Sequence, residues 1–314
     1  MLQDSHPAKM SRLFLTGGTG FLGGRLLQAL QRRGSDSIIA LDRSGSLHGR
    51  QREASPGGLE IVRADLLNPK DYQTELAKAE VVIHLAAMTG RASEADHLRV
   101  NLQGTEVLLD QCRRLGVHRF LFVSSIAAKF PDKTRYYYAQ AKLRAEEAVR
   151  SSGLRFSIIR PTIILGSGSP ILTALDKLAG LPVIPVFGDG RAMVQPIYAD
   201  DVVDFILSIL DQNLFSGDTL ELGGPATLTM EELIQEIRYL RKGAKGRSIH
   251  VPMSLLVTLL RSFETAGLGH LLPLSVGQLS PFRYNSTIES NPLFESRRDE
   301  LRSVSQMLAL SFAA

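Results

Sequence analysis

Short apolar runs alternate with amphipathic stretches along the first half of the chain. The apolar runs lie at residues 11–17, 37–42, 59–65, 79–87 and 118–125, and stretches with helical periodicity follow the first run and separate the last two. Strands that are apolar throughout are typical of a parallel sheet with both faces covered by helices. The pattern therefore predicts an α/β fold, a Rossmann-type doubly wound parallel sheet.

The second half of the chain changes in character after a further apolar run at 154–161, which Pro161 ends. Segments 166–170 and 181–191 are rich in Gly and Pro, which predicts loops. Helical periodicity returns in residues 199–210, in TMEELIQEIRYL and in VPMSLLVTLLRSF. We expect a smaller C-terminal lobe over the carboxyl edge of the sheet.

Composition adds few constraints to this picture. The chain has 314 residues, of which 44% are hydrophobic, enough for a substantial core. Its single cysteine, Cys112, cannot form an intrachain disulfide and is expected to be a small buried hydrophobic residue. With no apolar run of about 18 residues and no signal-peptide pattern, neither a membrane span nor export is indicated, and we expect a cytoplasmic protein.

The charge of the chain is modestly basic, with a net charge of +4 and a pI of about 9.2. This suits an anionic small molecule but does not indicate nucleic acid as a partner. The densest basic patch, between Arg238 and Arg247, lies where a helix is expected to end, and such patches are usually solvated surface. No metal site is expected.

The segment TGGTGFLG, residues 16–23, directly follows the first strand and opens an amphipathic helix. In this context Gly17 permits a tight turn, Gly20 lets the backbone approach a pyrophosphate, and Gly23 allows close packing of helix on strand. The N–H groups at the start of the helix can bind phosphate. We therefore predict a dinucleotide site here, which also includes these turn residues: Thr19, Phe21 and Leu22.

The ends of the next two strands bear on the choice of cofactor. Asp42 lies about 20 residues beyond the glycines, where a carboxylate bonds the adenosine ribose and disfavours the 2′-phosphate of NADP, whereas the adjacent Arg43 favours that phosphate. We favour NAD and keep NADP open. Asp65 and Leu66 are expected at the adenine edge, although Asp65 could equally cap the helix that follows.

Tyr138 and Lys142 are four residues apart, so they lie on one face of one helix. An apolar strand that ends in Ser124 and Ser125 precedes them. In this arrangement Lys142 holds the nicotinamide ribose and lowers the pKa of the phenol, Tyr138 exchanges a proton with a substrate oxygen, and Ser125 hydrogen-bonds that oxygen. The pattern predicts a hydride-transfer enzyme with these three catalytic residues.

Together these motifs resemble the short-chain dehydrogenase/reductase superfamily, in its extended and atypical NAD-dependent epimerase/dehydratase-like branch. The resemblance runs from about Arg12 to Leu240 and includes HLAA at 84–87 and LELGGPATLT. It implies that Asn101 supports the site, that His84 is structural, and that the helices holding Asn101 and Tyr138 could pair in a homodimer. Further cofactor contacts implied by the resemblance are Leu85, Ala86, Ala87, Ser124, Pro161 and Ile163.

We expect the substrate to enter between the carboxyl edge of the sheet and the smaller lobe. Arg191 and Arg160 are candidates to bind an anionic group, although Arg160 could instead form a structural ion pair, and Gln195 and Tyr198 could reach the pocket by family position. The expected divisions are an NAD(P)-binding Rossmann domain of residues 11–165 with returning segments at about 195–224, a substrate lobe of 166–194 and 225–290, and a C-terminal tail of 291–314.

Departures from the sugar-nucleotide epimerase pattern bear on the substrate. Only 13 positions separate Ser125 from Tyr138, and Arg160-Pro161 is followed by TIILG without the usual asparagine. Both features are more similar to the group that includes the NADH–ubiquinone oxidoreductase accessory subunit. The leading hypothesis is an oxidoreductase or epimerase/dehydratase, and the alternative is a non-catalytic NAD(P)-binding redox sensor or assembly protein. Residues 251–263 are expected to close the pocket, or else to face a membrane or partner.

Overall fold

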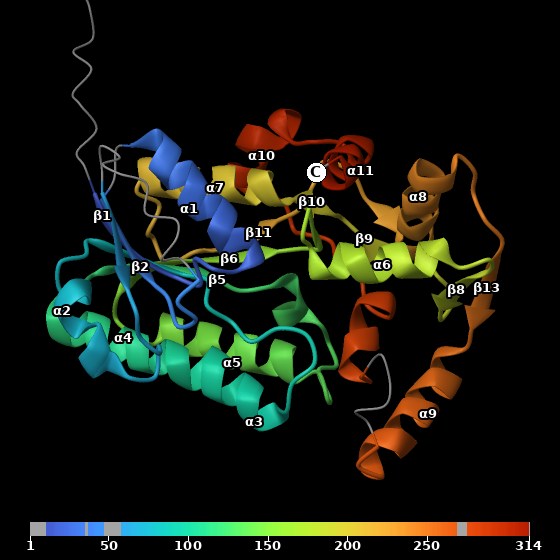
Figure 1. Cartoon of the computed structure of the whole chain (residues 1–314), viewed down its shortest axis with the longest axis horizontal. Helices are drawn as coiled ribbons and strands as arrows, with labels where there is room; N and C mark the ends of the chain where they lie inside the picture. The colour runs from blue at the N-terminus through green and yellow to red at the C-terminus, as the bar shows by residue number, and fades with distance from the viewer. Residues whose placement is uncertain (1–10, 35–36, 47–57, 269–274, 314) are drawn as a thin grey trace, which may run out of the picture.

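The computed structural model describes residues 11–34, 37–46, 58–268 and 275–313. Its centre is a seven-stranded sheet in which all neighbouring strands run parallel (Figure 1). The strands, in order across the sheet, are β11 (Thr219–Leu222), β6 (Arg155–Pro161), β5 (Arg119–Val123), β4 (Val81–His84), β1 (Arg12–Thr16), β2 (Ser37–Leu41) and β3 (Leu59–Val62). The order reverses between β1 and β4, which confirms the predicted doubly wound sheet.

Five helices cover the two faces of the sheet: α1 (Phe21–Arg33), α2 (Gln73–Leu76), α4 (Gly104–Leu115), α5 (Tyr137–Arg150) and α7 (Ala199–Asp211). Successive side chains of a strand point to opposite faces, so Leu13 and Leu15 of β1 pack with α1 and α7, whereas Phe14 packs with the helices of the other face. Figure 1 shows α1 and α7 on one side and α2, α4 and α5 on the other. Cys112 of α4 is fully buried, as expected.

Apart from the apolar residues on the two faces of the sheet, a separate lobe cluster of buried apolar residues begins at Ile163, directly after β6. Three small pairs of strands surround it, β7 with β10, β8 with β13 and β9 with β12. The elements of this region are β7 (Ile164–Leu165), α6 (Pro170–Gly180), β8 (Ile184–Phe187), β9 (Met193–Val194), β10 (Ile197–Tyr198), β12 (Leu228–Thr229), α8 (Met230–Lys242), β13 (Ser248–Val251) and α9 (Met253–Thr265).

Two C-terminal helices, α10 (Pro292–Arg297) and α11 (Val304–Phe312), contact the sheet and the lobe cluster respectively. Phe294 of α10 packs with the residues between the sheet and α7, and Met307 of α11 packs in the lobe cluster. Shorter elements among the described residues are α3 (Glu94–His97), a π-helix (Leu98–Gln103) and 3₁₀ turns at Pro69–Asp71, Ile126–Lys129, Gly277–Phe282 and Arg298–Glu300. Within the described part of the chain, no helix has both the length and the apolar character that a membrane span requires.

Candidate active site

The turn between β1 and α1 has a backbone that only glycine accommodates at two positions. Gly17 has a φ of +76°, and a Cβ there would lie 2.6 Å from the Ala86 nitrogen. A Cβ at Gly23 would lie 2.0 Å from the carbonyl oxygen of Gly17, so α1 packs on the turn at backbone contact distance. Gly20 is the N-cap of α1 and has no side chain to bond the first N–H groups, which stay available to an anion.

A cavity of about 220 Å³ opens beside this turn, at the carboxyl ends of β1 to β4. Nine of the expected cofactor contacts line it: Gly17, Thr19, Gly20, Arg43, Asp65, Leu66, Leu85, Ala86 and Ala87. Six lining residues were not predicted: Leu41, Ala64, Leu67, Met88, Arg99 and Val100. Asp65 also accepts a hydrogen bond from the Leu67 nitrogen at 2.9 Å, so it both lines the cavity and holds the turn that follows β3.

At the end of β2, Asp42 and Arg43 differ in what they face. The Asp42 side chain is fully buried, and its Oδ1 accepts hydrogen bonds from the nitrogens of Ser44 and Gly45 at 3.0 and 3.1 Å. Arg43 is exposed and lines the cavity. Asp42 thus shapes the loop after β2, and among the described residues of this loop Arg43 is the charged side chain that lines the cavity.

A chain of hydrogen bonds runs from the cavity wall into the core through His84. The Ala86 nitrogen donates to Thr16 Oγ1 at 3.2 Å, and Thr16 Oγ1 lies 2.6 Å from His84 Nδ1. On the other side, His84 Nε2 lies 3.0 Å from Thr105 Oγ1, which donates to the Asn101 carbonyl oxygen. Because Thr105 uses its proton on Asn101, His84 donates from Nε2 and accepts from Thr16 at Nδ1. His84 is therefore a neutral structural residue, as expected.

Asn101 completes this wall from within the π-helix. Its Oδ1 accepts from the Met88 nitrogen at 2.6 Å, and its Nδ2 donates to the Met88 carbonyl oxygen at 2.9 Å. Asn101 thereby fixes Met88, which lines the cavity. Single π-helical turns are frequent at functional sites, where they turn a side chain that an α-helix would aim elsewhere.

The buried state of His84 predicts a pH dependence of folding. Burial, helped by the charge of Lys142, lowers the pKa of His84 from 6.5 to about 3. Between these values the unfolded chain binds a proton that the folded chain does not, so stability falls as pH falls through this window. We expect this residue alone to lower the free energy of unfolding by about 2 kcal/mol between pH 7 and pH 5. Urea denaturation at both pH values measures the loss, and His84→Gln should lack that component; an equal pH dependence in the variant would contradict the assignment.

Ser125 and Tyr138 lie at the ends of two elements on the same side of the molecule. Ser125 follows β5 and caps the 3₁₀ turn, its Oγ accepting from the Ala127 nitrogen at 3.2 Å. Tyr138 is in the first turn of α5, with its phenol beside the Ser125 hydroxyl. Burial raises the pKa of Tyr138, and the Ser125 hydroxyl lowers it by less. The phenol therefore keeps its proton at neutral pH, and the expectation that Lys142 lowers its pKa is wrong, because burial dominates.

Lys142 lies one helical turn beyond Tyr138 and is buried. Its Nζ donates to the Val123 carbonyl oxygen at 2.7 Å and lies 4.6 Å from the centre of the Phe122 ring. Burial lowers the pKa of Lys142 to about 7, and the charge of Glu146 acts in the opposite direction. The amine is thus held between the end of β5 and the helix that carries Tyr138.

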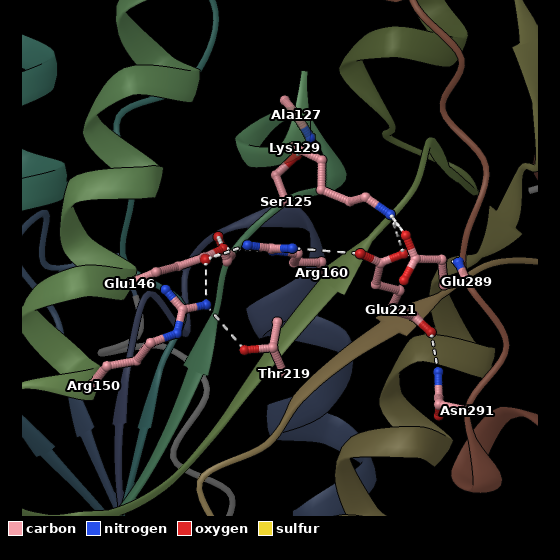
Figure 2. Close-up of polar contacts among 11 residues, drawn as sticks. Ser125, Ala127, Lys129, Glu146, Arg150, Arg160, Thr219, Glu221, Glu289 and Asn291 are labelled. Atoms are coloured by element: carbon pink, nitrogen blue, oxygen red, sulfur yellow. Dashed lines mark hydrogen bonds and ion pairs between the residues drawn. The ribbon is translucent and has the colours of Figure 1, made fainter. Parts of the chain in front are cut away.

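An ion-pair network ties the same helix to the edge of the sheet (Figure 2). Glu146 is fully buried and accepts two hydrogen bonds from Arg160 at 2.9 and 2.6 Å and one from the Ser124 hydroxyl at 2.6 Å. Arg160 also contacts Glu221 of β11 at 3.4 Å. Burial raises the pKa of Glu146, but the bonds from Arg160 and Ser124 together lower it below its ordinary value. Arg160 thus forms the structural ion pair and not an anion site.

The network continues from Glu221 to the segment before α10. Glu221 Oε2 accepts from Lys129 at 3.0 Å and from the Glu289 nitrogen at 2.8 Å, and its carbonyl oxygen accepts from Asn291 at 2.8 Å (Figure 2). Lys129 belongs to the turn that Ser125 caps. The position of that turn is therefore set by both β11 and the C-terminal segment.

The structure does not bring all of the expected site residues together. The Gln195 amide donates to the Gly224 carbonyl oxygen at 2.8 Å and accepts from the Ile288 nitrogen at 3.1 Å, so it joins backbone segments. Arg191 is exposed in the loop between β8 and β9. Leu22, Pro161, Ile163 and Tyr198 are buried, and the Phe21 ring stacks under Arg25, 5.3 Å from ring centre to guanidinium.

His97 is a neighbour of Tyr138 that the sequence analysis missed. Its buried ring lies edge-on to the phenol, with centres 6.2 Å apart, and its Nδ1 lies 3.5 Å from the Nδ2 of Asn101, which bonds Met88. Burial lowers the pKa of His97, so it is neutral at neutral pH. The signal was its position four residues before Asn101, on the same helix face. Through His97 and Met88, Tyr138 is connected to the cavity wall.

Aromatic rings surround the other side of Tyr138. The Tyr136 ring lies 6.0 Å from it, and the Phe130 ring lies 6.3 Å from Tyr136 and 5.6 Å from Tyr284. All of these residues belong to one apolar cluster with Ala127 and Ala139. The surroundings of the phenol are therefore largely apolar.

Comparison with known proteins adds relatives of several kinds. Ceramide reductase of Caulobacter vibrioides is 34% identical over 188 residues, which cover 60% of this chain and 57% of that protein, so the chain aligns with less than two thirds of this relative. The mitochondrial NADH dehydrogenase [ubiquinone] 1 alpha subcomplex subunit 9 of Arabidopsis thaliana is 28% identical over 289 residues, covering 88% of this chain and 71% of that protein.

Solved structures share the fold at lower identity. A UDP-glucuronic acid 4-epimerase from Bacillus cereus, in complex with UDP-glucuronic acid and NAD, has a TM-score of 0.71 at 18% identity, covering 96% of this chain and 98% of that chain. A nucleoside-diphosphate-sugar epimerase from Staphylococcus aureus has a TM-score of 0.73 at 16% identity, covering 95% and 99%. The family model described as NAD dependent epimerase/dehydratase family matches residues 13–223, more than half of the chain. The chain belongs to the NAD dependent epimerase/dehydratase family.

Proposed function

We propose that the chain is an NAD-dependent oxidoreductase that interconverts a hydroxyl and a carbonyl group, as a net reaction or within an epimerisation or dehydration. The observation that carries this proposal is the position of the Ser125 hydroxyl beside the Tyr138 phenol, one helical turn from the buried Lys142. These are the three groups that proton transfer to a substrate oxygen requires at one place: a donor, a group that orients the oxygen, and a cation.

The cavity beside the glycine turn fits a dinucleotide. Gly17 and Gly23 allow backbone contacts that any Cβ would obstruct, and the start of α1 offers N–H groups to a pyrophosphate. When bound, the dinucleotide supplies or accepts the hydride. We propose NAD as the cofactor. NADP is kept as the alternative, because Arg43 lines the cavity while the Asp42 carboxylate bonds its own loop.

In the proposed reaction each residue has one task. Tyr138 gives its proton to the substrate oxygen during reduction and takes it back during oxidation, and its raised pKa keeps it protonated and ready for reduction at neutral pH. Ser125 holds that oxygen by a hydrogen bond. Lys142, whose pKa is lowered to about 7, can exchange its hydrogen bond with the Val123 carbonyl oxygen for one with the cofactor ribose.

The substrate we propose has a carbon skeleton that packs against aromatic rings. Tyr136, Phe130 and Tyr284 form the apolar surroundings of Tyr138. Two relatives are named for compounds that carry hydrocarbon chains. They are ceramide reductase and 2-alkyl-3-oxoalkanoate reductase, which match this chain at 34% and 27% identity over parts of their length. We therefore propose a ketone or secondary alcohol attached to a hydrocarbon chain.

A second candidate is a non-catalytic NAD-binding protein. The Arabidopsis relative is by name a subunit of NADH dehydrogenase. In this case the dinucleotide would bind in the same cavity, and Tyr138 would have no role in proton transfer.

Deuteride exchange separates the two candidates. The protein is mixed with NADH or NADPH deuterated at C4 and with a panel of long-chain ketones, small ketones and nucleotide sugars, and deuterium in the products is measured. We expect transfer to at least one long-chain ketone, and none when Tyr138 is replaced by Phe. Cofactor binding without transfer to any member of the panel would favour the non-catalytic candidate.

Replacing Gly23 by Ala tests the cofactor site. Because the new Cβ would lie 2.0 Å from the Gly17 oxygen, α1 must move away from the turn. We expect the affinity for NADH, measured by fluorescence titration, to fall at least about tenfold, a loss of about 1.4 kcal/mol. Gly180→Ala is the matched control, since its Cβ meets open space at the end of α6. Unchanged affinity in Gly23→Ala would contradict the proposed site.

A further inference from the structure

Exposed apolar side chains gather at one end of the molecule. Among the described residues, nine large hydrophobic side chains are exposed, and eight of them lie in residues 181–183 and 239–268. The ninth, Leu310, is on α11. Figure 1 shows α8, β8, β13 and α9 together at one end of the long axis. We call residues 181–183 and 238–268 the apolar basic end.

Hydrogen bonds hold the two segments of the apolar basic end against each other. The Ile184 nitrogen donates to the Arg247 carbonyl oxygen at 2.9 Å, and β8 pairs with β13 from that point. Arg238 donates to the Leu181 carbonyl oxygen at 2.6 Å. The exposed side chains of Val183 and Ile249 thus belong to one continuous surface. β13 is followed in the chain by α9.

α9 contributes two of these side chains, and one of them, Leu255, is the most exposed of the nine. Leu255 and Leu259 are 62% and 49% exposed and lie one turn apart on the same face, whereas Leu260 is buried against the lobe. The inner face also contacts the segment before α5: Glu264 accepts a hydrogen bond from Arg135 at 3.1 Å, and Arg135 lies three residues before Tyr138. α9 therefore packs with one face toward the segment before Tyr138 and presents an apolar face outward.

The charge of this end is unlike that of the rest of the chain. Residues 238–268 contain six of the 36 Lys and Arg residues and one of the 32 Asp and Glu residues, a net charge of +5 against +4 for the whole chain. Lys245 and Arg241 are 63% and 52% exposed, and their ion pairs with acidic neighbours are 3.4 Å contacts at the surface, which are weak. Protein interfaces are depleted in lysine, whereas lysine and arginine beside exposed leucines are typical of helices that lie on anionic membranes.

We propose that the apolar basic end docks on the surface of an anionic lipid bilayer. Leu255 and Leu259 insert at the level of the acyl chains, and the cations between Arg238 and Arg247 contact the headgroups. The binding is peripheral and depends on both apolar area and charge, since each cation near an anionic surface contributes only about 1 kcal/mol. It does not depend on the proposed catalytic function.

Vesicle sedimentation tests the proposal. The purified chain is centrifuged with vesicles of phosphatidylcholine, or of phosphatidylcholine with about one third phosphatidylglycerol, at low and high salt. We expect binding to the anionic vesicles alone, weakened by salt. The double variant Leu255→Ser with Leu259→Ser should lower the partition coefficient at least tenfold, and Lys245→Ser with Arg247→Ser should lower it and reduce its salt dependence.

Matched controls are Leu310→Ser for the apolar side chains and Lys70→Ser for the charges, since both residues are exposed outside the apolar basic end. Both controls should bind like the unchanged chain. Absence of binding to anionic vesicles, or equal losses in the controls, would overturn the proposal. A dimer in light scattering that the Leu255 and Leu259 substitutions dissociate would assign the surface to a second copy and overturn it as well.

Discussion

Tyr138→Phe is expected to lower kcat by about 100-fold to 10,000-fold while leaving NADH affinity unchanged. The substitution removes only the hydroxyl that gives a proton to the substrate oxygen, and the ring keeps its packing against His97 and Tyr136. Stopped-flow or deuteride-exchange rates with a substrate found in the ketone panel measure the effect, and fluorescence titration measures cofactor affinity.

Tyr137→Phe is the matched control, because Tyr137 is the neighbouring tyrosine on α5 and has no part in the proposed site. It should keep its activity. A Tyr138→Phe variant that retains full turnover, or that loses activity only together with cofactor affinity, would show that the phenol is not the proton donor.

Arg160→Met is expected to lower the free energy of unfolding by about 3–5 kcal/mol. It leaves the Glu146 carboxylate fully buried without its two hydrogen bonds from Arg160 and removes a cation from the buried Glu221. The loss should shrink toward pH 5, because the pKa of Glu146 rises when Arg160 is removed and the carboxyl can then fold in its protonated form. Guanidinium denaturation at pH 7 and pH 5 measures both effects.

Arg150→Met provides the comparison for this prediction. Arg150 also bonds Glu146, at 2.8 Å, but its side chain is 38% exposed. Its loss should cost less than about 1 kcal/mol, as for exposed pairs. Equal losses in the two variants would contradict the view that Arg160 is the structural partner of Glu146.

Most of the fold could be predicted from the chain's apolar runs. The strands at 12–16, 37–41, 59–62, 81–84 and 119–123 all fall inside the runs that predicted them. Because β1, β2, β4 and β5 are buried on both faces, each is a nearly continuous apolar segment, whereas the edge strand β3 carries the exposed Glu60. A family resemblance based on the glycine turn and the Tyr138–Lys142 pair agrees with the family model.

The C-terminal helices were harder to predict from the same principles. α10 and α11 are short, and their apolar residues face two different clusters, so no single periodic stripe appears. The signals that exist are local: Asn291 and Ser303 cap the two helices, and Ser303 with Gln306 forms a capping box.

The details of the site depend on partners that are far apart in the sequence. For Arg160 the sequence leaves two roles open, an anion site and a structural ion pair. The structure shows the ion pair, with Glu146 and with Glu221, which lies 61 residues further on. Gln195 was expected at the substrate by family position, yet its amide bonds backbone atoms 29 and 93 residues away. Motif spacing along one helix predicts the neighbours of Tyr138. It does not predict which residue far along the chain forms a hydrogen bond or ion pair with each polar group.

The proposals for substrate and for membrane docking come from different residues and agree. We propose a hydrocarbon substrate from the aromatic surroundings of Tyr138, and the apolar basic end includes the outer face of α9, whose Glu264 bonds Arg135. Each proposal keeps its own test, so one can fail without the other.

A crystal structure of the chain with NADH tests the central claim most directly. We expect the pyrophosphate at the start of α1, the nicotinamide ring beside Tyr138 and Ser125, and Lys142 Nζ released from the Val123 carbonyl oxygen to bond the ribose. A bound dinucleotide whose nicotinamide lies away from Tyr138, with Lys142 still on Val123, would contradict the proposed oxidoreductase site.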